Sequence, residues 1–204
     1  FRFQSYGRLS GGFDSWNIDY VYLNYNRHPG DTVYEDRALT TIPGSFLRGY
    51  TAMPYSHFIT DVAGNTQNVA AGFYNLDRLV QPIEYSVFIR DTTGIFDQMN
   101  DLTVLDPNPA GFERRTIFSD PVDPAAFDIE HDTIALRLET VFFINSGDSV
   151  QFDNAVDYRL NDTTSSTVQL DRVLAYDDGT AEWAAGLSQG GNKLAYRFVA
   201  SRPD

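Results

Sequence analysis

The chain has 204 residues, of which 42% are hydrophobic and 14% aromatic, so it can bury a core and is not a disordered tail. Its formal net charge of −13 argues against nucleic acid and anionic membrane surfaces as partners, and no apolar run is long enough for membrane insertion. The absence of cysteine excludes disulfides, thiol catalysis and cysteine-based zinc sites.

Residues 1–24 predict two β-strands, because apolar and polar side chains alternate within both of their apolar runs. The second run places four bulky side chains on one face: Trp16, Ile18, Tyr20 and Tyr22. Two strands are not stable alone in water, so these must pair with strands outside the segment. Residues 25–58 carry turn signals and scattered aromatic residues without a clear period, and they predict an ordered connector.

Residues 59–171 predict a β-sandwich, because strand-like runs recur at the spacing typical of that architecture. The predicted strands are 68–76, 83–90, 111–118, 133–144, 155–160 and 167–170. The side chains expected to face the core are Ile83, Tyr85, Val87 and Ile89 in one strand and Ile134, Leu136, Leu138, Phe142 and Ile144 in another. With about seven strands and no long helix, the segment fits an immunoglobulin- or fibronectin-III-like domain that folds on its own.

Residues 172–204 predict the opening strands of a further β-domain, since two apolar runs flank a glycine-rich turn. The chain begins at Phe1 without methionine and ends directly after a strand-like run, so we expect a piece of a longer protein. The predicted fold class is therefore all-β, with an Ig/fibronectin-III-like sandwich flanked by two partial β-sandwich segments.

Several short motifs at the two ends are familiar. They are Tyr-Asp-Asp-Gly-Thr-Ala-Glu at 176–182, Gly-Leu at 186–187, Ala-Tyr-Arg-Phe at 195–198, Phe-Arg-Phe at 1–3, the run at 13–23, and Met-Pro-Tyr-Ser-His-Phe at 53–58. Together they resemble large extracellular proteins of the Bacteroidota, many of which are cargo of the type IX secretion system. The resemblance implies closing strands of a jelly-roll domain at 1–24 and opening strands of a second jelly roll at 172–204. It implies no activity.

Asp177, Asp178 and Glu182 form the best candidate metal site. Three carboxylates beside a glycine turn can wrap a hard cation such as Ca²⁺, which prefers oxygen ligands. The alternative is a turn stabilised by hydrogen bonds from the aspartate side chains to the backbone. The sequence therefore predicts no cofactor, with a structural calcium ion as the alternative.

Aspartate followed by Ser or Thr, and then by an aliphatic residue or Thr, occurs five times. The hydroxyl-bearing residues are Thr32, Thr92, Thr133, Ser149 and Thr163. The pattern resembles the acceptor motif for protein O-glycosylation in Bacteroidota, which implies glycosylation at these positions. The alternative is structural, because a turn aspartate often precedes a β-branched residue at the start of a strand.

Catalytic motifs are missing from the sequence. The three histidines, His28, His57 and His131, lie at neither metal-ligand nor triad spacing, and neither a phosphate-binding loop nor a nucleophile elbow is present. Trp16 and Trp183 can stack on a sugar, although aromatic residues at strand spacing are more often core. We therefore expect no enzymatic activity.

The leading hypothesis is a structural or adhesive module of a larger secreted or cell-surface protein. One alternative is a carbohydrate-binding module of a polysaccharide-degrading enzyme, and another is a subunit of an extracellular fibre assembled by β-strand complementation. The expected partners are the remainder of the same polypeptide or neighbouring subunits, through β-strand pairing, with glycans as a further candidate. The expected location is extracellular or at the cell surface.

Overall fold

The structure, a computed structural model, describes residues 25, 28–31, 35–127, 135–147, 157–177, 190–195 and 197–199. The chain divides into two compact units, Phe1–Thr32 and Val33–Asp204. In the first unit the described residues form a turn, in which the Asp31 carboxylate accepts a hydrogen bond from the His28 backbone N–H at 2.8 Å.

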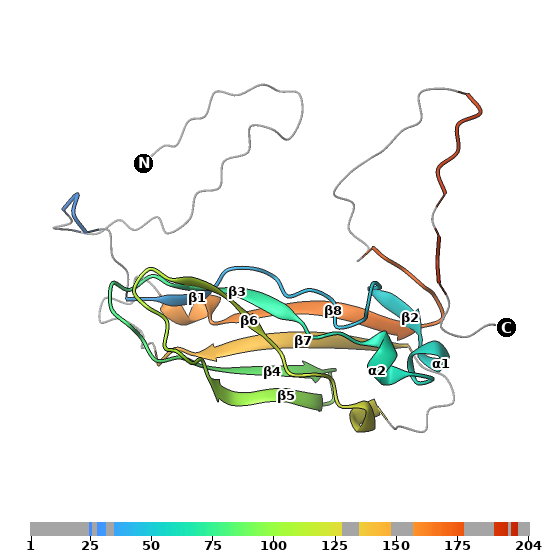
Figure 1. The fold of residues 1–204 in the computed structure, drawn as a ribbon, viewed down its shortest axis with the longest axis horizontal. Helices are drawn as coiled ribbons and strands as arrows, with labels where there is room; N and C mark the ends of the chain where they lie inside the picture. Colours follow the sequence, from blue (N-terminus) through green and yellow to red (C-terminus); the bar gives the residue numbers. More distant parts are fainter. Residues whose placement is uncertain are drawn as a thin grey trace. The chain divides into compact units, whose positions relative to one another are not determined.

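The second unit is an all-β, sandwich-like fold of two sheets (Figure 1). The three-stranded sheet has the order β1 (Arg37–Leu39), β3 (Ala70–Asn75), β6 (Arg114–Phe118). The five-stranded sheet has the order β2 (Ala52–Pro54), β8 (Thr163–Asp171), β7 (Leu136–Asn145), β4 (Glu84–Arg90), β5 (Ile95–Val104). Every neighbouring pair among these strands is antiparallel except β2 and β8, which run parallel.

Helical structure in the described residues is confined to single turns. The α-helices are α1 (Tyr55–Phe58) and α2 (Val62–Asn65), and the 3-10 turns are η1 (Pro124–Phe127) and η2 (Tyr158–Asn161). Asp61 begins α2 because its side chain accepts a hydrogen bond from the Gly64 N–H, a bond typical of a helix N-cap. Within the described part of the chain, no helix is long and apolar enough to cross a membrane.

The core lies between the two sheets, and the period-two pattern of the sequence identifies much of it. Ile83, Tyr85, Val87 and Ile89 are buried, as are Leu138, Phe142 and Ile144 on the neighbouring strand β7. These inward positions are confirmed; Leu136 is partly buried against the same core, and Ile134 lies outside the described residues. One contiguous cluster joins them to Phe73 and Ile117 of the three-stranded sheet, so both sheets share a single core.

Five of the six predicted strands overlap an observed strand: β3, β4, β6, β7 and β8. The prediction of a strand at 155–160 is wrong in its described part, because residues 158–161 form η2. Asp157 precedes that turn and accepts a hydrogen bond from the Arg159 N–H, which favours a helical start over an extended chain. The sequence pattern does not predict β5.

The segment expected to be an ordered connector, 25–58, contributes two strands to the sandwich. β1 pairs with β3 and β2 pairs with β8. Between them, Phe46, Leu47 and Tyr50 are buried in the common core. Strands of three residues are too short to show a period, so the sequence pattern could not reveal them.

The predicted flanking strands are described only in part. Residues 1–24 lie outside the described residues. Of the segment 172–204, the described residues contain one isolated bridge, between Ala175 and Ala52, and are otherwise not in strands. The jelly-roll assignments of both ends therefore stay predictions.

The strand registers place the start of β1 and the end of β8 at opposite ends of the sandwich. Arg37 pairs with Asn75 at the end of β3, where the chain turns into β4. At the other end, Leu170 near the end of β8 pairs with Leu136 at the start of β7. Figure 1 shows β1 towards the left of the sandwich and the arrowhead of β8 at the right. We call these the entry end and the exit end.

Candidate functional site

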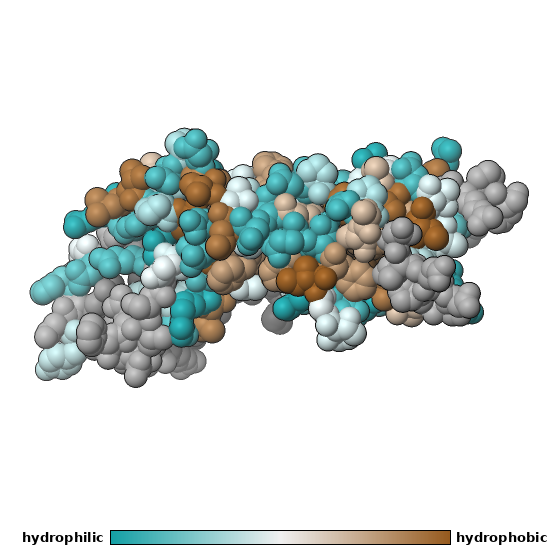
Figure 2. All heavy atoms as spheres, turned by 90° about the horizontal axis from the view of Figure 1, so that it is seen from below, coloured by the Kyte–Doolittle hydropathy of each residue, from teal (hydrophilic) through white to brown (hydrophobic). Residues whose placement is uncertain are grey.

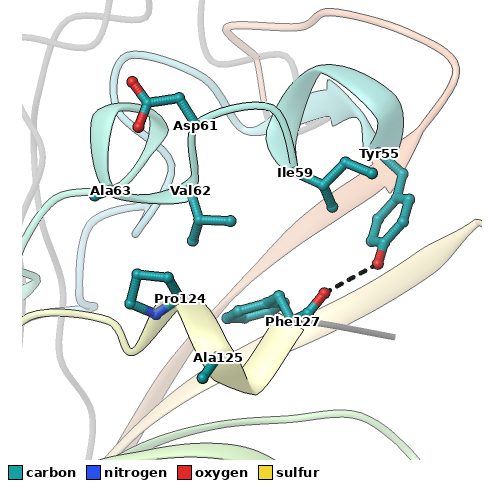
Figure 3. A pocket seen from close by; sticks show the side chains of 8 residues that line it. All are labelled: Tyr55, Ile59, Asp61, Val62, Ala63, Pro124, Ala125 and Phe127. Atoms are coloured by element: carbon teal, nitrogen blue, oxygen red, sulfur yellow. Dashed lines mark hydrogen bonds between the residues drawn. The ribbon is translucent and has the colours of Figure 1, made fainter. Parts of the chain in front are cut away.

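A cleft of about 540 Å³ lies near the exit end, between the α1–α2 segment and η1 (Figure 3). The lining residues are Tyr55, Ile59, Asp61, Val62, Ala63, Pro124, Ala125 and Phe127. This volume falls within the range of small-molecule sites in proteins. The cleft is therefore the first place to look for a ligand among the described residues.

The floor of the cleft is held firmly by aromatic packing. Phe127 contacts Phe58 edge-to-face at a centroid distance of 5.0 Å, and it stacks on Phe46 and Phe96 at 6.3 and 6.0 Å. The Tyr55 hydroxyl donates a hydrogen bond to the Phe127 carbonyl at 3.2 Å, which fastens one wall to the floor. Since these residues are largely buried, the shape of the cleft is set by the core itself.

Strand β5 positions η1 through a buried carboxylate. The Asp97 carboxylate accepts a hydrogen bond from the Asp123 N–H at 2.9 Å, and the Asp123 carboxylate accepts one from the Ala125 N–H at 2.9 Å. Burial raises the pKa of Asp97, and the nearby Asp123 charge adds to the rise, although the hydrogen bond from the Asp123 N–H lowers it in part. The ionised Asp97 carboxylate therefore lowers the stability of the folded state, but its hydrogen bond to Asp123 positions η1, which forms one wall of the cleft.

The chemistry available in the cleft is mainly apolar. In Figure 3 the Asp61 carboxylate points away from Phe127, and it accepts the Gly64 N–H at 2.8 Å as the cap of α2. The Tyr55 hydroxyl is already engaged with the Phe127 carbonyl. The eight lining side chains include no serine, threonine, histidine or lysine, so they offer no nucleophile with an adjacent base. The cleft can bury an apolar group.

The candidate metal ligands are described only at Asp177. Its side chain is exposed, and its backbone carbonyl accepts a hydrogen bond from the Thr51 hydroxyl. Asp178 and Glu182 lie outside the described residues. Among the described residues, no group of three His, Cys, Asp or Glu side chains is arranged to hold a metal ion. Calcium binding at 177–182 stays a prediction.

Two of the five candidate glycosylation residues are described, Thr92 and Thr163, and both are exposed. At Thr92 the preceding aspartate has a structural role, because the Asp91 carboxylate accepts hydrogen bonds from the Thr93 and Gly94 N–H groups. The hydrogen bond from the Thr93 hydroxyl is the main reason that the pKa of Asp91 is lowered. Thr32, Thr133 and Ser149 lie outside the described residues, so glycosylation at all five stays a prediction.

A polar network centred on Asn75 lies at the entry end and is not predicted from the sequence. The Asn75 side-chain amide is fully buried and donates to the carbonyls of Leu79 and Ala110 at 2.9 Å, and to that of Pro109 at 3.3 Å. It thereby joins the loop between β3 and β4 to the loop between β5 and β6. The sequence did offer one signal for this network: Asn75 falls at an inward position at the end of an alternating strand. A buried side-chain amide must find hydrogen-bond partners, so an asparagine at such a position indicates a polar network.

Comparison with known proteins assigns no relative: no protein-family model matches the chain, and no curated protein matches it. Sequence and geometry alone therefore carry any inference about what this chain does.

Proposed function

We propose that this chain is a non-catalytic structural module, an in-line β-sandwich spacer in a larger secreted or cell-surface protein. The observation that carries the proposal is the placement of the entry and exit ends at opposite ends of the strands. A module of this kind adds its own length to the polypeptide, because the chain that follows starts from the far end.

The strands give the spacer its length and its resistance to load. β7 has ten residues, which corresponds to about 34 Å of extended chain. A force applied between the two ends acts along β7 and β8, perpendicular to the backbone hydrogen bonds that join them. The bonds of the ladder then share the load in shear, whereas a force across neighbouring strand ends would open them one at a time.

The surface and the sequence resemblance favour an exposed, acidic spacer. The formal net charge is −13, and on the face drawn in Figure 2 brown apolar residues are scattered among teal hydrophilic ones. The apolar side chains on that face therefore lie in small separate groups. Such groups suit limited contacts with adjoining parts of the same polypeptide or with neighbouring subunits. The resemblance of the chain ends to extracellular proteins of the Bacteroidota supports the proposed location.

Mechanical unfolding tests the proposal, and the absence of native cysteine makes site-specific attachment simple. Handles are attached to Glu35→Cys at the entry end and Val173→Cys at the exit end, both at exposed positions. The matched control carries Glu35→Cys and Arg78→Cys, whose positions lie at the same end and load β1 and β3 by peeling.

The end-to-end pull is expected to give one cooperative unfolding event at a force about twofold or more above the control, because shear loads many bonds together. Equal forces in the two geometries, or gradual extension in the end-to-end pull, would overturn the spacer proposal. Selective binding of the chain on a glycan array would instead favour the carbohydrate-binding alternative.

A further inference from the structure

Three aromatic rings from distant parts of the sequence stack at the exit end. Tyr50 and Tyr176 lie with ring centroids 4.8 Å apart and planes 19° apart. Tyr176 and Phe198 follow at 4.9 Å and 17°. These values are typical of stacked aromatic side chains, which attract one another beyond the area that they bury.

Both tyrosine hydroxyls also bind the backbone beside Phe198. The Tyr50 hydroxyl donates to the Val199 carbonyl at 2.7 Å and accepts from the Val199 N–H at 3.0 Å. The Tyr176 hydroxyl donates to the Arg197 carbonyl at 2.7 Å. One side chain thus satisfies both backbone groups of Val199, much as a neighbouring strand does.

The two tyrosines are themselves fixed to the sandwich. Tyr50 is only 9% exposed and belongs to the hydrophobic core. Tyr176 follows Ala175, whose N–H donates to the Ala52 carbonyl at 3.0 Å and whose carbonyl accepts from the Thr51 N–H at 2.8 Å. The stack is therefore anchored through backbone pairing to the edge strand β2.

We infer that Tyr50 and Tyr176 form a docking site on the sandwich for the chain's own residues 197–199, with Phe198 as the aromatic anchor. The site recognises an extended segment through its backbone groups and through one flat side chain. We call this arrangement the tyrosine latch. It fixes the direction in which the chain leaves position 199.

The latch deepens the spacer proposal and rests on it for its biological purpose, because a spacer transmits direction only when the chain leaves it at a fixed angle. The contacts of Tyr50 and Tyr176 with residues 197–199 are nonetheless tested by a different experiment from the one that tests the spacer function. Mechanical unfolding reports on the load path through the sheets, whereas limited proteolysis reports on whether residues 197–199 stay docked. Either proposal can therefore fail alone.

Limited trypsin digestion of the full chain reads the latch at Arg197. Trypsin cleaves only an extended chain that fits its active site, so a docked Arg197 is protected in proportion to the population that opens. Lys193 is exposed and is an internal control four residues earlier. In the unmodified chain we expect cleavage after Lys193 to be faster than cleavage after Arg197.

Tyr176→Phe keeps the ring but loses the hydroxyl, and Tyr50→Phe does the same at the second position. In each variant we expect cleavage after Arg197 to rise about tenfold, with little change after Lys193, since the open population increases. The amide of Val199 is expected to exchange hydrogen faster in Tyr50→Phe, because its acceptor is removed. Circular dichroism and the thermal transition establish that each variant is folded.

Two results would overturn the latch. The first is equal cleavage after Lys193 and Arg197 in the unmodified chain, which would mean that residues 197–199 are not docked. The second is an unchanged Arg197 cleavage rate in both folded variants, which would mean that the hydroxyls do not hold the segment. If Tyr50→Phe fails to fold, Tyr176→Phe decides alone, since Tyr176 is 40% exposed and lies outside the core.

Discussion

At the scale of single residues, the polar side chains that face the core are the most informative. Thr140 lies on the inward face of β7 between Leu138 and Phe142 and is fully buried. Among the described residues its hydroxyl oxygen has no hydrogen-bond partner. A buried hydroxyl without a partner costs free energy, because it loses its bonds to water and gains none in return.

Replacing this hydroxyl is therefore expected to stabilise the protein. Thr140→Val keeps the β-branched shape and should raise the free energy of unfolding by about 0.5–2 kcal/mol. Leu138→Ala at the neighbouring inward position is the contrasting variant, which should lower it by about 2–5 kcal/mol through lost burial and a cavity. Denaturant unfolding measures both. A destabilised Thr140→Val would mean that the hydroxyl makes a stabilising contact.

At the scale of elements, the edge strand β5 is the clearest case of a strand that its sequence pattern does not predict. Its pairing with β4 contains three register irregularities, which break the simple alternation of sides. Asp97 and Asn100 face inward, and their side chains accept hydrogen bonds from the Asp123 and Asp120 N–H groups. The segment from Asp120 to Asp123 is thus held against the inward face of β5 by hydrogen bonds to side chains.

The buried Asp97 predicts a distinct pH dependence. Its folded-state pKa lies above the ordinary value of an aspartate, so the folded state binds the proton more tightly than the unfolded state. The stability that this group contributes is complete below the unfolded pKa and is lost as the pH rises from about 4 through the folded pKa. Asp97→Asn keeps an acceptor for the Asp123 N–H but does not titrate.

We therefore expect the stability of the unmodified chain relative to Asp97→Asn to fall as the pH rises. The difference is measured by the unfolding free energies of both proteins from about pH 3.5, just below the ordinary carboxyl pKa, to about pH 7, well above it. Glu139 has a lowered pKa and produces the opposite slope, but it is present in both proteins and cancels. A difference that is constant with pH would show that Asp97 titrates normally.

At the scale of the whole molecule, the sandwich begins earlier in the sequence than its strand pattern suggests. The sequence predicts that the segment 59–171 folds on its own. It lacks β1 and β2, and it also lacks Phe46, Leu47 and Met53, each of which is at most 1% exposed in the common core. Removing these residues exposes the core side chains that they cover. It also removes an edge strand from each sheet, β1 from the three-stranded sheet and β2 from the five-stranded sheet.

Two fragments test whether the sandwich needs β1 and β2 to fold. We expect the fragment 59–171 to show no cooperative thermal transition and the fragment 33–204, which corresponds to the second compact unit, to show one. Differential scanning calorimetry compares them. A cooperative transition in 59–171 with an enthalpy similar to that of 33–204 would contradict the expectation, because it would mean that β1 and β2 contribute little.

The sequence by itself determined the all-β class, the face of β4 and β7 that is buried, and the location of five of the strands. The buried faces of β4 and β7 follow from local alternation over seven and ten residues, which the sequence pattern shows directly. Only the tertiary structure decided the roles of β1, β2, β5 and the tyrosine latch. Their stability comes from partners far away in the chain, such as Val199 for Tyr50 and Asp123 for Asp97, and no local pattern encodes such a distance.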